Sequence, residues 1–134
     1  MYLIDTNIFL EVMLSRKRSE ECKRLLTMLR EGKIKGITTD FTIYSIMILL
    51  EKFNRLSELK RFLLSLTAYK GLLIYVLSIT DKVRAVEEAK KGKLDLDDAL
   101  QYVSALSVKA KAIVSFDKDL DRLKIPRVEP KDIV

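Results

Sequence analysis

Acidic residues fall at positions of this sequence where strands would end and helices would begin. Asp5 ends an N-terminal apolar run, and Asp117 ends a second apolar run at residues 112–116. Between them, Asp97 and Asp98 open a stretch with helical periodicity. In an open α/β sheet, the carboxyl ends of the strands and the starts of the following helices share one edge, where residues distant in sequence converge. Converging carboxylates repel each other unless a cation lies between them. The spacing therefore predicts a divalent-metal site and, with it, phosphate chemistry.

The residue types that the sequence lacks narrow this chemistry. There is no histidine, and Cys22 is the only cysteine. This excludes a Ser-His-Asp triad, a histidine general base and a thiolate zinc cluster. Cys22 sits among leucines at helical spacing, which favours a small buried side chain over a nucleophile. Any catalysis must use carboxylates, hydroxyls, lysines, water and a metal ion.

The acids differ in how well their positions suit a metal ligand. Asp95 opens the helical stretch and is expected to be its N-cap, a role that explains one or two acids there but not three. Asp98 precedes an apolar pair, which puts it near the buried edge of the helix. Asp117 lies nearest to the end of its strand and ranks above Asp119. Asp5, taken alone, is more often a turn residue or a helix cap.

Length and composition indicate one domain, residues 1–134, with a basic surface. The chain is near the commonest domain size, and its 49% hydrophobic content excludes disorder. No apolar run is long enough to cross a bilayer, and the N-terminus lacks a signal-peptide pattern, so we expect a cytoplasmic protein without a membrane partner. The net charge of +6 favours nucleic acid or an acidic partner, although many such residues are simply solvated helix faces.

Short apolar runs alternate with amphipathic stretches, the pattern of an α/β fold. The run at residues 72–77 is apolar throughout and predicts a buried strand, whereas Pro126 restricts the last strand to a sheet edge. Ser57 is the predicted cap of its helix. Strands are predicted at residues 2–4, 37–38, 72–77, 112–116 and 125–128, and helices at residues 6–14, 19–30, 41–53, 57–66, 81–91 and 95–110.

The helices at residues 41–53 and 57–66 are apolar over more than one stripe. A wide core face explains this as well as a surface buried against a second subunit does. Of the possible assembly states, we expect a homodimer.

Three segments, taken in order, resemble the PIN domain family. They are residues 2–7 (Tyr-Leu-Ile-Asp-Thr-Asn), residues 94–100 (Leu-Asp-Leu-Asp-Asp-Ala-Leu) and residues 113–119 (Ile-Val-Ser-Phe-Asp-Lys-Asp). The resemblance covers essentially the whole chain. PIN domains have the ribonuclease fold of VapC-type toxins from toxin–antitoxin pairs and of related archaeal proteins. The resemblance therefore implies a three-layer α/β/α sandwich with a short, mostly parallel central sheet.

The resemblance also implies an activity and a site. Asp5, Asp98 and Asp117 match acids of the family that bind Mg²⁺ or Mn²⁺, so the expected activity is RNA hydrolysis by a metal-activated water. RNA and an antitoxin protein are the implied partners. Thr6 and Ser115 match the small hydroxyl residues that support the family's site. Together with neighbouring polar residues, the expected supporting set is Thr6, Asn7, Asp40, Asp97, Ser115 and Asp119.

One position departs from the family pattern. The family usually carries a glutamate in the helix after the second strand, and the matching position here is Ser45. Glu51 lies nearly two turns further on, whereas Asp40 at the helix start could point toward the same edge. Three carboxylates can still hold one Mg²⁺, which commonly keeps several waters. A degenerate PIN domain that binds RNA or protein without catalysis is the alternative.

Two other phosphate-processing families fit the sequence less well. Phosphatases of the haloacid dehalogenase type need Asp-x-Asp after the first strand, and here Asn7 takes the place of the second acid. Response-regulator receivers need an aspartate at the end of a mid-chain strand. The run at residues 72–77 is followed by Ser78, and Asp40 falls too early in the chain.

Overall fold

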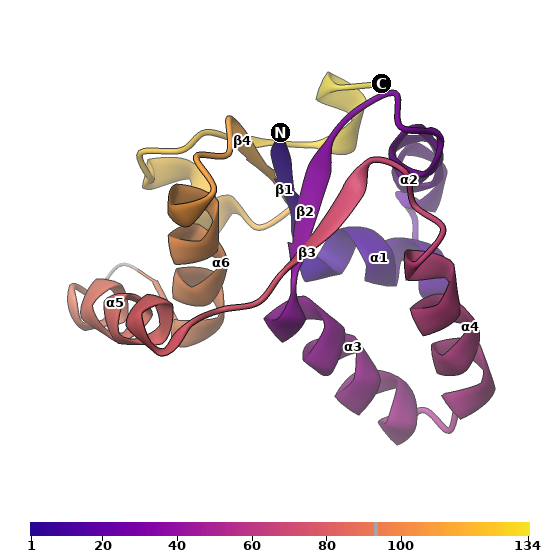
Figure 1. Cartoon of the computed structure of the whole chain (residues 1–134), viewed down its shortest axis with the longest axis horizontal. Helices are drawn as coiled ribbons and strands as arrows, with labels where there is room; N and C mark the ends of the chain where they lie inside the picture. Colours follow the sequence, from indigo (N-terminus) through magenta and orange to yellow (C-terminus); the bar gives the residue numbers. More distant parts are fainter. Residues whose placement is uncertain (93) are drawn as a thin grey trace.

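The computed structural model describes residues 1–92 and 94–134 as a parallel sheet enclosed by helices (Figure 1). The sheet has five strands in the order β3-β2-β1-β4-β5. The strands are β1 (Tyr2–Ile4), β2 (Gly36–Thr39), β3 (Leu72–Tyr75), β4 (Ala112–Val114) and β5 (Arg127–Val128). The helices are α1 (Thr6–Met13), α2 (Ser19–Glu31), α3 (Asp40–Lys52), α4 (Leu56–Leu66), α5 (Ile79–Lys90) and α6 (Leu96–Ser107), with 3-10 turns η1 (Lys118–Arg122) and η2 (Pro130–Asp132).

The strand order reverses at the centre of the sheet. β1 lies at the centre and pairs in parallel with β2 on one side and with β4 on the other. From β1 the chain winds outward through β2 to β3, and then it returns across the sheet to β4 and β5. In open α/β sheets, ligands bind outside the carboxyl ends of the strands where the order reverses. Here that point lies between β1 and β4, the strands that lead to Asp5 and Asp117.

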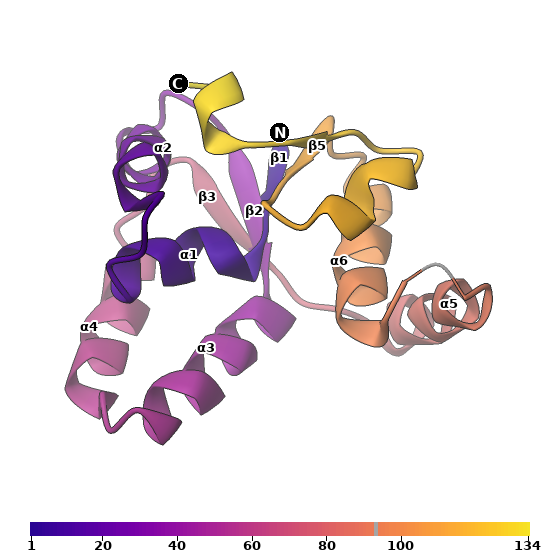
Figure 2. The same cartoon turned by 180° about the vertical axis from the view of Figure 1, so that it is seen from behind.

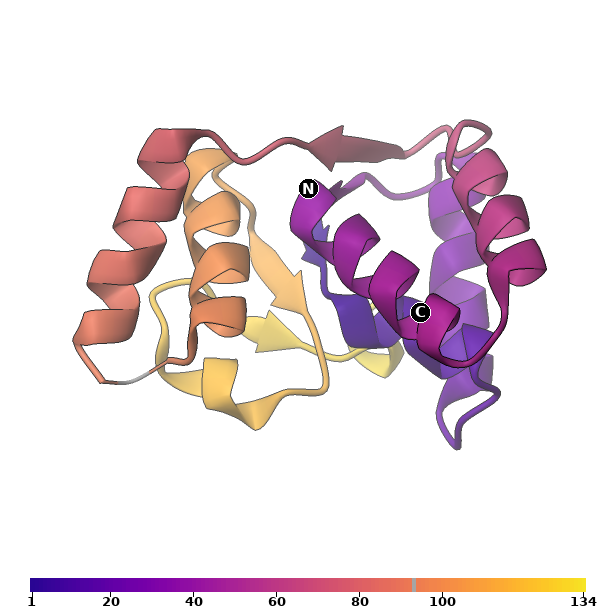
Figure 3. The ribbon, with the colours of Figure 1, turned by 90° about the horizontal axis from the view of Figure 1, so that it is seen from below.

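A hydrophobic core lies on each face of the sheet. Leu3 and Ile4 are adjacent in β1 and both fully buried, and they face opposite sides because side chains alternate along a strand. Ile4 packs in one core with α1, α2, α3 and α4, whereas Leu3 packs in the other with α5 and α6. Figure 2 and Figure 3 show the two groups of helices on opposite sides of the sheet. The predicted α/β/α sandwich is confirmed.

A strand forms within residues 72–77, but the prediction that it is buried is wrong. β3 ends at Tyr75 and lies at an edge, where it pairs with β2 alone among the described strands. The side chain of Leu73 is 63% exposed, and Ile74 and Val76 are exposed as well. A short apolar run is typical of a strand covered on both faces, but the run itself does not encode the strand order.

Helix α4 starts without the predicted cap. It begins at Leu56 with Arg55 in the N-cap position, so Ser57 lies inside the first turn. Asn54 has a left-handed backbone with φ of 57°, and the Arg55 N–H donates to the carbonyl of Leu50 at 2.9 Å. The tight turn that ends α3 therefore leads directly into α4.

The helices are short, and α2 illustrates how they pack. With 13 residues, α2 and α3 are as long as any helix in the described residues, and none of these helices is long and apolar enough to cross a membrane. Cys22 lies on the buried face of α2. Burial raises the pKa of its thiol to about 12, so the side chain packs as a small apolar group, as predicted.

Candidate metal centre

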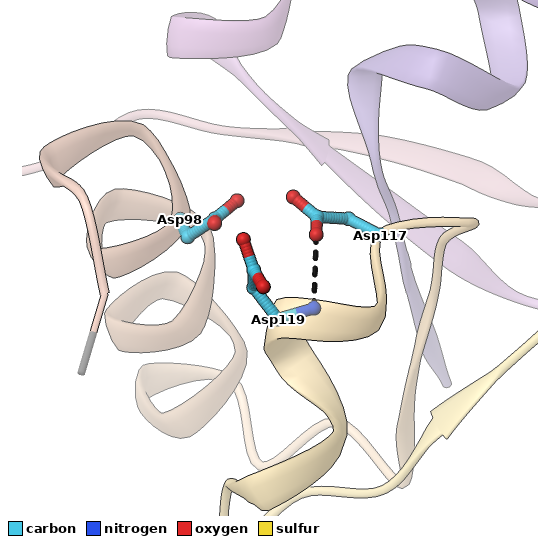
Figure 4. A group of neighbouring side chains, drawn as sticks. All are labelled: Asp98, Asp117 and Asp119. Carbon is cyan, nitrogen blue, oxygen red and sulfur yellow. Dashed lines mark hydrogen bonds between the residues drawn. The ribbon is translucent and has the colours of Figure 1, made fainter.

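Three carboxylates converge at the carboxyl edge of the sheet. Asp98 comes from the first turn of α6, Asp117 is the N-cap of η1, and Asp119 lies in the first turn of η1. Each offers an oxygen within 4.8 Å of the oxygens offered by the other two. In Figure 4 the carboxylates of Asp98 and Asp117 point toward each other, with that of Asp119 beside them. We call these three residues the carboxylate cluster.

Helix capping sets the positions of the cluster. Asp95 is the N-cap of α6, and its side chain accepts a hydrogen bond from the backbone N–H of Asp98 at 2.9 Å. This is the role predicted for Asp95, and it fixes Asp98 at the start of the helix. Asp117 caps η1 in the same way by accepting from the N–H of Asp119 at 2.9 Å. Leu120 is fully buried and anchors η1 in the core beside α6.

Burial and neighbouring negative charges disfavour the ionised form of Asp98. Asp98 is 8% exposed, and its pKa is raised to about 7, first by burial and then by the charges of Asp117, Asp95 and Asp5. A cation between the carboxylates would favour their ionised forms and reverse this effect. Oxygen ligands of this kind suit Mg²⁺ or Mn²⁺. The donor set therefore fits a hard divalent ion.

Asp5 lies beside the cluster but is not one of its three members. It is 7% exposed, and burial is the largest cause of the raised pKa of its carboxyl. Its Oδ1 accepts from the N–H of Thr6 at 2.8 Å and from Nε2 of Gln101 at 2.9 Å. Its Oδ2 accepts from Oγ of Ser115 at 2.6 Å and from Nδ2 of Asn7 at 3.3 Å. Both oxygens are thus engaged with protein donors.

Ser115 links Asp5 to the cluster. While its Oγ donates to Asp5, it accepts from Nδ2 of Asn7 at 3.2 Å and from the backbone N–H of Asp117 at 3.0 Å. A change in the Asp5 carboxylate would therefore reach the backbone of a cluster residue through one hydroxyl. Asn7 and Ser115 both donate hydrogen bonds to Asp5.

A buried polar network behind Asp5 was not predicted. Gln101 of α6 donates to Asp5 and to Oγ1 of Thr42 at 2.8 Å, and its Oε1 accepts from Oγ1 of Thr39 at 2.9 Å. The hydroxyls of Thr6 and Thr42 are 2.9 Å apart, which ties α1 to α3. One signal was available in the sequence, because Gln101 follows Asp98 by three residues and shares its helix face.

The remaining predicted residues lie outside the cluster. Asp40 accepts from the N–H of Leu77 at 3.2 Å and so fastens the segment after β3. Asp97 is exposed at the start of α6. Ser45 is half-buried on α3, one turn beyond Thr42. Among the residues that the structure describes, no fourth acid joins the group of three.

Comparison with known proteins points to one family. A profile of the PIN domain matches residues 2–126. A search of curated proteins found no match.

Solved structures share the fold over nearly the whole chain. A toxin–antitoxin complex from Klebsiella pneumoniae aligns with a TM-score of 0.73 and 22% identity, over 97% of this chain and 98% of that one. The toxin VapC20 of Mycobacterium tuberculosis, described as cleaving the sarcin-ricin loop, aligns with a TM-score of 0.76 and 13% identity, over 97% and 100%. VapBC2 of Rickettsia felis, bound to a DNA fragment from its promoter, aligns with a TM-score of 0.69 and 17% identity, over 96% and 97%.

Proposed function

This chain belongs to the PIN domain family, and we propose that it is an endoribonuclease that hydrolyses RNA phosphodiester bonds with a divalent metal ion. The observation that carries this proposal is the convergence of Asp98 with Asp117 and Asp119. Asp98 comes from a different element than the other two, so one local turn does not explain the group. The net charge of +6 suits a polyanionic substrate.

The residues divide into those that hold the metal and those that hold the ligands in place. Asp98, Asp117 and Asp119 would hold Mg²⁺ or Mn²⁺ through their oxygens. When bound, such an ion lowers the pKa of a water and offsets the charge that develops on the phosphate. Asp5 orients Ser115, and Ser115 fixes the backbone of Asp117. In this proposal Asp5 acts chiefly through its neighbours.

Cleavage of RNA in Mn²⁺ tests the function. We expect Asp117→Asn to lower the cleavage rate by at least about 100-fold, the scale for losing a group that stabilises transition-state charge. Asp5→Asn should lower the rate by about 10- to 100-fold, the scale for residues that orient metal ligands. The measurement is the cleavage rate of a labelled RNA with and without EDTA.

Asp97→Asn is the matched control, because Asp97 is an exposed aspartate of the same helix that lies outside the cluster. It should cut at the wild-type rate. Equal rates in wild type, Asp5→Asn and Asp117→Asn would contradict the proposed site.

The proposed biological role is the toxin of a toxin–antitoxin pair in the cytoplasm. The structures that share the fold include a toxin–antitoxin complex and VapBC2, each aligned over at least 96% of this chain. An antitoxin would then be the protein partner and RNA the substrate.

We also propose a homodimer that uses the outer face of α3 and α4. Tyr44 and Ile48 lie one turn apart on α3 and are 62% and 58% exposed, and Leu64 of α4 is similarly exposed. Replacing Ile48 by aspartate should shift the sedimentation coefficient from that of a dimer to that of a monomer, because burying a charge in an apolar interface is costly. Since Ile48 is exposed in the single chain, the substitution should not destabilise the fold of the monomer itself.

Val83→Asp is the control for this experiment, since Val83 is an equally exposed apolar residue on α5. It should remain dimeric. A monomeric wild type would contradict the homodimer, and dissociation by Val83→Asp alone would contradict the choice of face.

A non-catalytic PIN domain that binds RNA or protein is the second candidate. The observation that favours it is Ser45 on α3, where the family usually carries a glutamate. Wild-type protein that binds RNA but does not cut it in Mn²⁺ would support this reading.

A further inference from the structure

A pocket opens directly beside the carboxylate cluster. Its volume is about 600 Å³, within the range of roughly 300–1,000 Å³ typical of ligand sites. It lies between the end of α5, the buried side of α6 and the η1 turn, and Asp119 belongs both to its wall and to the cluster. The other lining residues are Glu88, Lys91, Leu94, Tyr102, Lys118, Arg122, Leu123 and Lys124.

The rim of the pocket is basic. Four cationic side chains line it, against the carboxylates of Glu88 and Asp119. Lys91 pairs with Glu88 at 3.2 Å. In contrast, Lys118, Arg122 and Lys124 make no ion pair with any residue in the described ranges 1–92 and 94–134. These three charges are available to an anion.

The floor of the pocket is apolar with one polar handle. Leu94 is buried and Leu123 half-buried, so both offer apolar surface to a ligand. Tyr102 is 4% exposed, and within the described part of the chain its hydroxyl has no hydrogen-bond partner. Tyr102 is one of the residues that line the pocket. A buried tyrosine hydroxyl usually has a partner, which a ligand can supply here.

We propose that this pocket binds one unpaired nucleotide of the RNA next to the scissile phosphate. The base lies against Leu94 and Leu123 and hydrogen-bonds the hydroxyl of Tyr102, while a phosphate is held by Lys118, Arg122 and Lys124. A base can enter such a pocket only when it is unstacked. This inference rests on the proposed ribonuclease function and assigns to it the residues that hold one nucleotide beside the cluster.

The test measures binding of a short, unpaired, labelled RNA to protein that carries Asp98→Asn, which prevents cleavage. Lys118→Ala and Arg122→Ala should each weaken binding by about five- to tenfold at low salt and reduce the slope of log K against log salt by about 0.7. Tyr102→Phe should weaken binding by about two- to tenfold without a change in that slope, because it removes only a neutral hydrogen bond. The same RNA held in a duplex should bind the Asp98→Asn protein equally well with and without Tyr102→Phe.

Lys60→Ala is the charge-matched control, because Lys60 is an exposed lysine on α4, the layer on the other face of the sheet. It should leave affinity and slope unchanged.

If Lys118→Ala and Arg122→Ala bind RNA as Lys60→Ala does, the pocket proposal is overturned. If wild type cuts RNA in Mn²⁺ and the pocket variants cut the same sites at the same rate, the pocket fails while the ribonuclease function stands. If wild type does not cut but the pocket variants lose affinity, the nuclease function fails and the nucleotide pocket stands.

Discussion

Replacing Asp98 by asparagine is expected to stabilise the metal-free protein at pH 8 and to abolish its stabilisation by Mn²⁺. In the wild type, Asp98 is buried against other carboxylates, which raises its pKa to about 7. At pH 8 the folded state must therefore carry a charge that burial and its neighbours disfavour. Asparagine removes that charge, so the free energy of unfolding without metal should rise by about 1–3 kcal/mol. It also removes a ligand, so Mn²⁺ should no longer raise the melting temperature.

The pH dependence distinguishes this effect from a simple packing change. The pKa of Asp98 is higher in the folded state than the value near 3.9 of an unfolded chain. The folded state then binds more protons between these two pKa values, so stability contributed by this group is present below about pH 4 and is lost as the pH rises through 7. Asp98→Asn should thus match the wild type near pH 4 and exceed it at pH 8. Thermal melts in EDTA and in Mn²⁺ at both pH values measure this.

Asp97→Asn provides the control for Asp98→Asn. The two aspartates are adjacent in the first turn of α6, but Asp97 is exposed and lies outside the cluster. Its replacement should keep the full Mn²⁺ response. A wild-type Mn²⁺ response in Asp98→Asn would contradict a metal site at the cluster.

The sequence predicts the acids at the sheet edge because that prediction needs only local patterns and one geometric rule. Asp5 and Asp117 follow apolar runs, and the carboxyl ends of parallel strands meet at one edge. The same reasoning could not rank the acids within the site. Asp119 joins the cluster because Asp117 caps η1 and turns the chain back. Asp5 is buried outside the group of three, and its oxygens accept hydrogen bonds from Ser115 and Gln101.

Features that depend on contacts between distant segments were not predictable. The exposure of Leu73 follows from the position of β3 at the sheet edge, and strand order is a property of the whole topology. The sequence places Gln101 on the same helix face as Asp98, but the role of Gln101 depends on three threonine or aspartate partners that lie at least 59 residues away in sequence. A glutamine in an apolar helix face signals a buried network only once its partners are known.

Gln101→Leu is expected to destabilise the protein and to impair cleavage together. Leucine has a similar volume, so the change leaves little cavity, but Asp5, Thr39 and Thr42 each lose a buried hydrogen-bond partner. Each group keeps another partner, so the loss is that of three buried hydrogen bonds at about 0.5–1.5 kcal/mol each, and we expect the free energy of unfolding to fall by about 2–4 kcal/mol. Urea denaturation at pH 7.5 measures the loss. Cleavage should fall by about 10- to 100-fold because Asp5 no longer holds Ser115 firmly.

Gln101→Glu separates lost hydrogen bonds from lost shape. Glutamate keeps the shape of glutamine but puts a second carboxyl where the amide nitrogen lies 2.9 Å from Asp5. Two carboxyls at that distance cannot both ionise in a buried site, so at pH 8 this variant should be at least as unstable as Gln101→Leu. Near pH 5 a protonated carboxyl can donate the hydrogen bond to Asp5 that the amide donates in the wild type, and much of the stability should return. Gln101→Leu has no such group and should stay destabilised relative to the wild type at both pH values. Wild-type stability and cleavage in Gln101→Leu would show that Asp5 does not depend on this network.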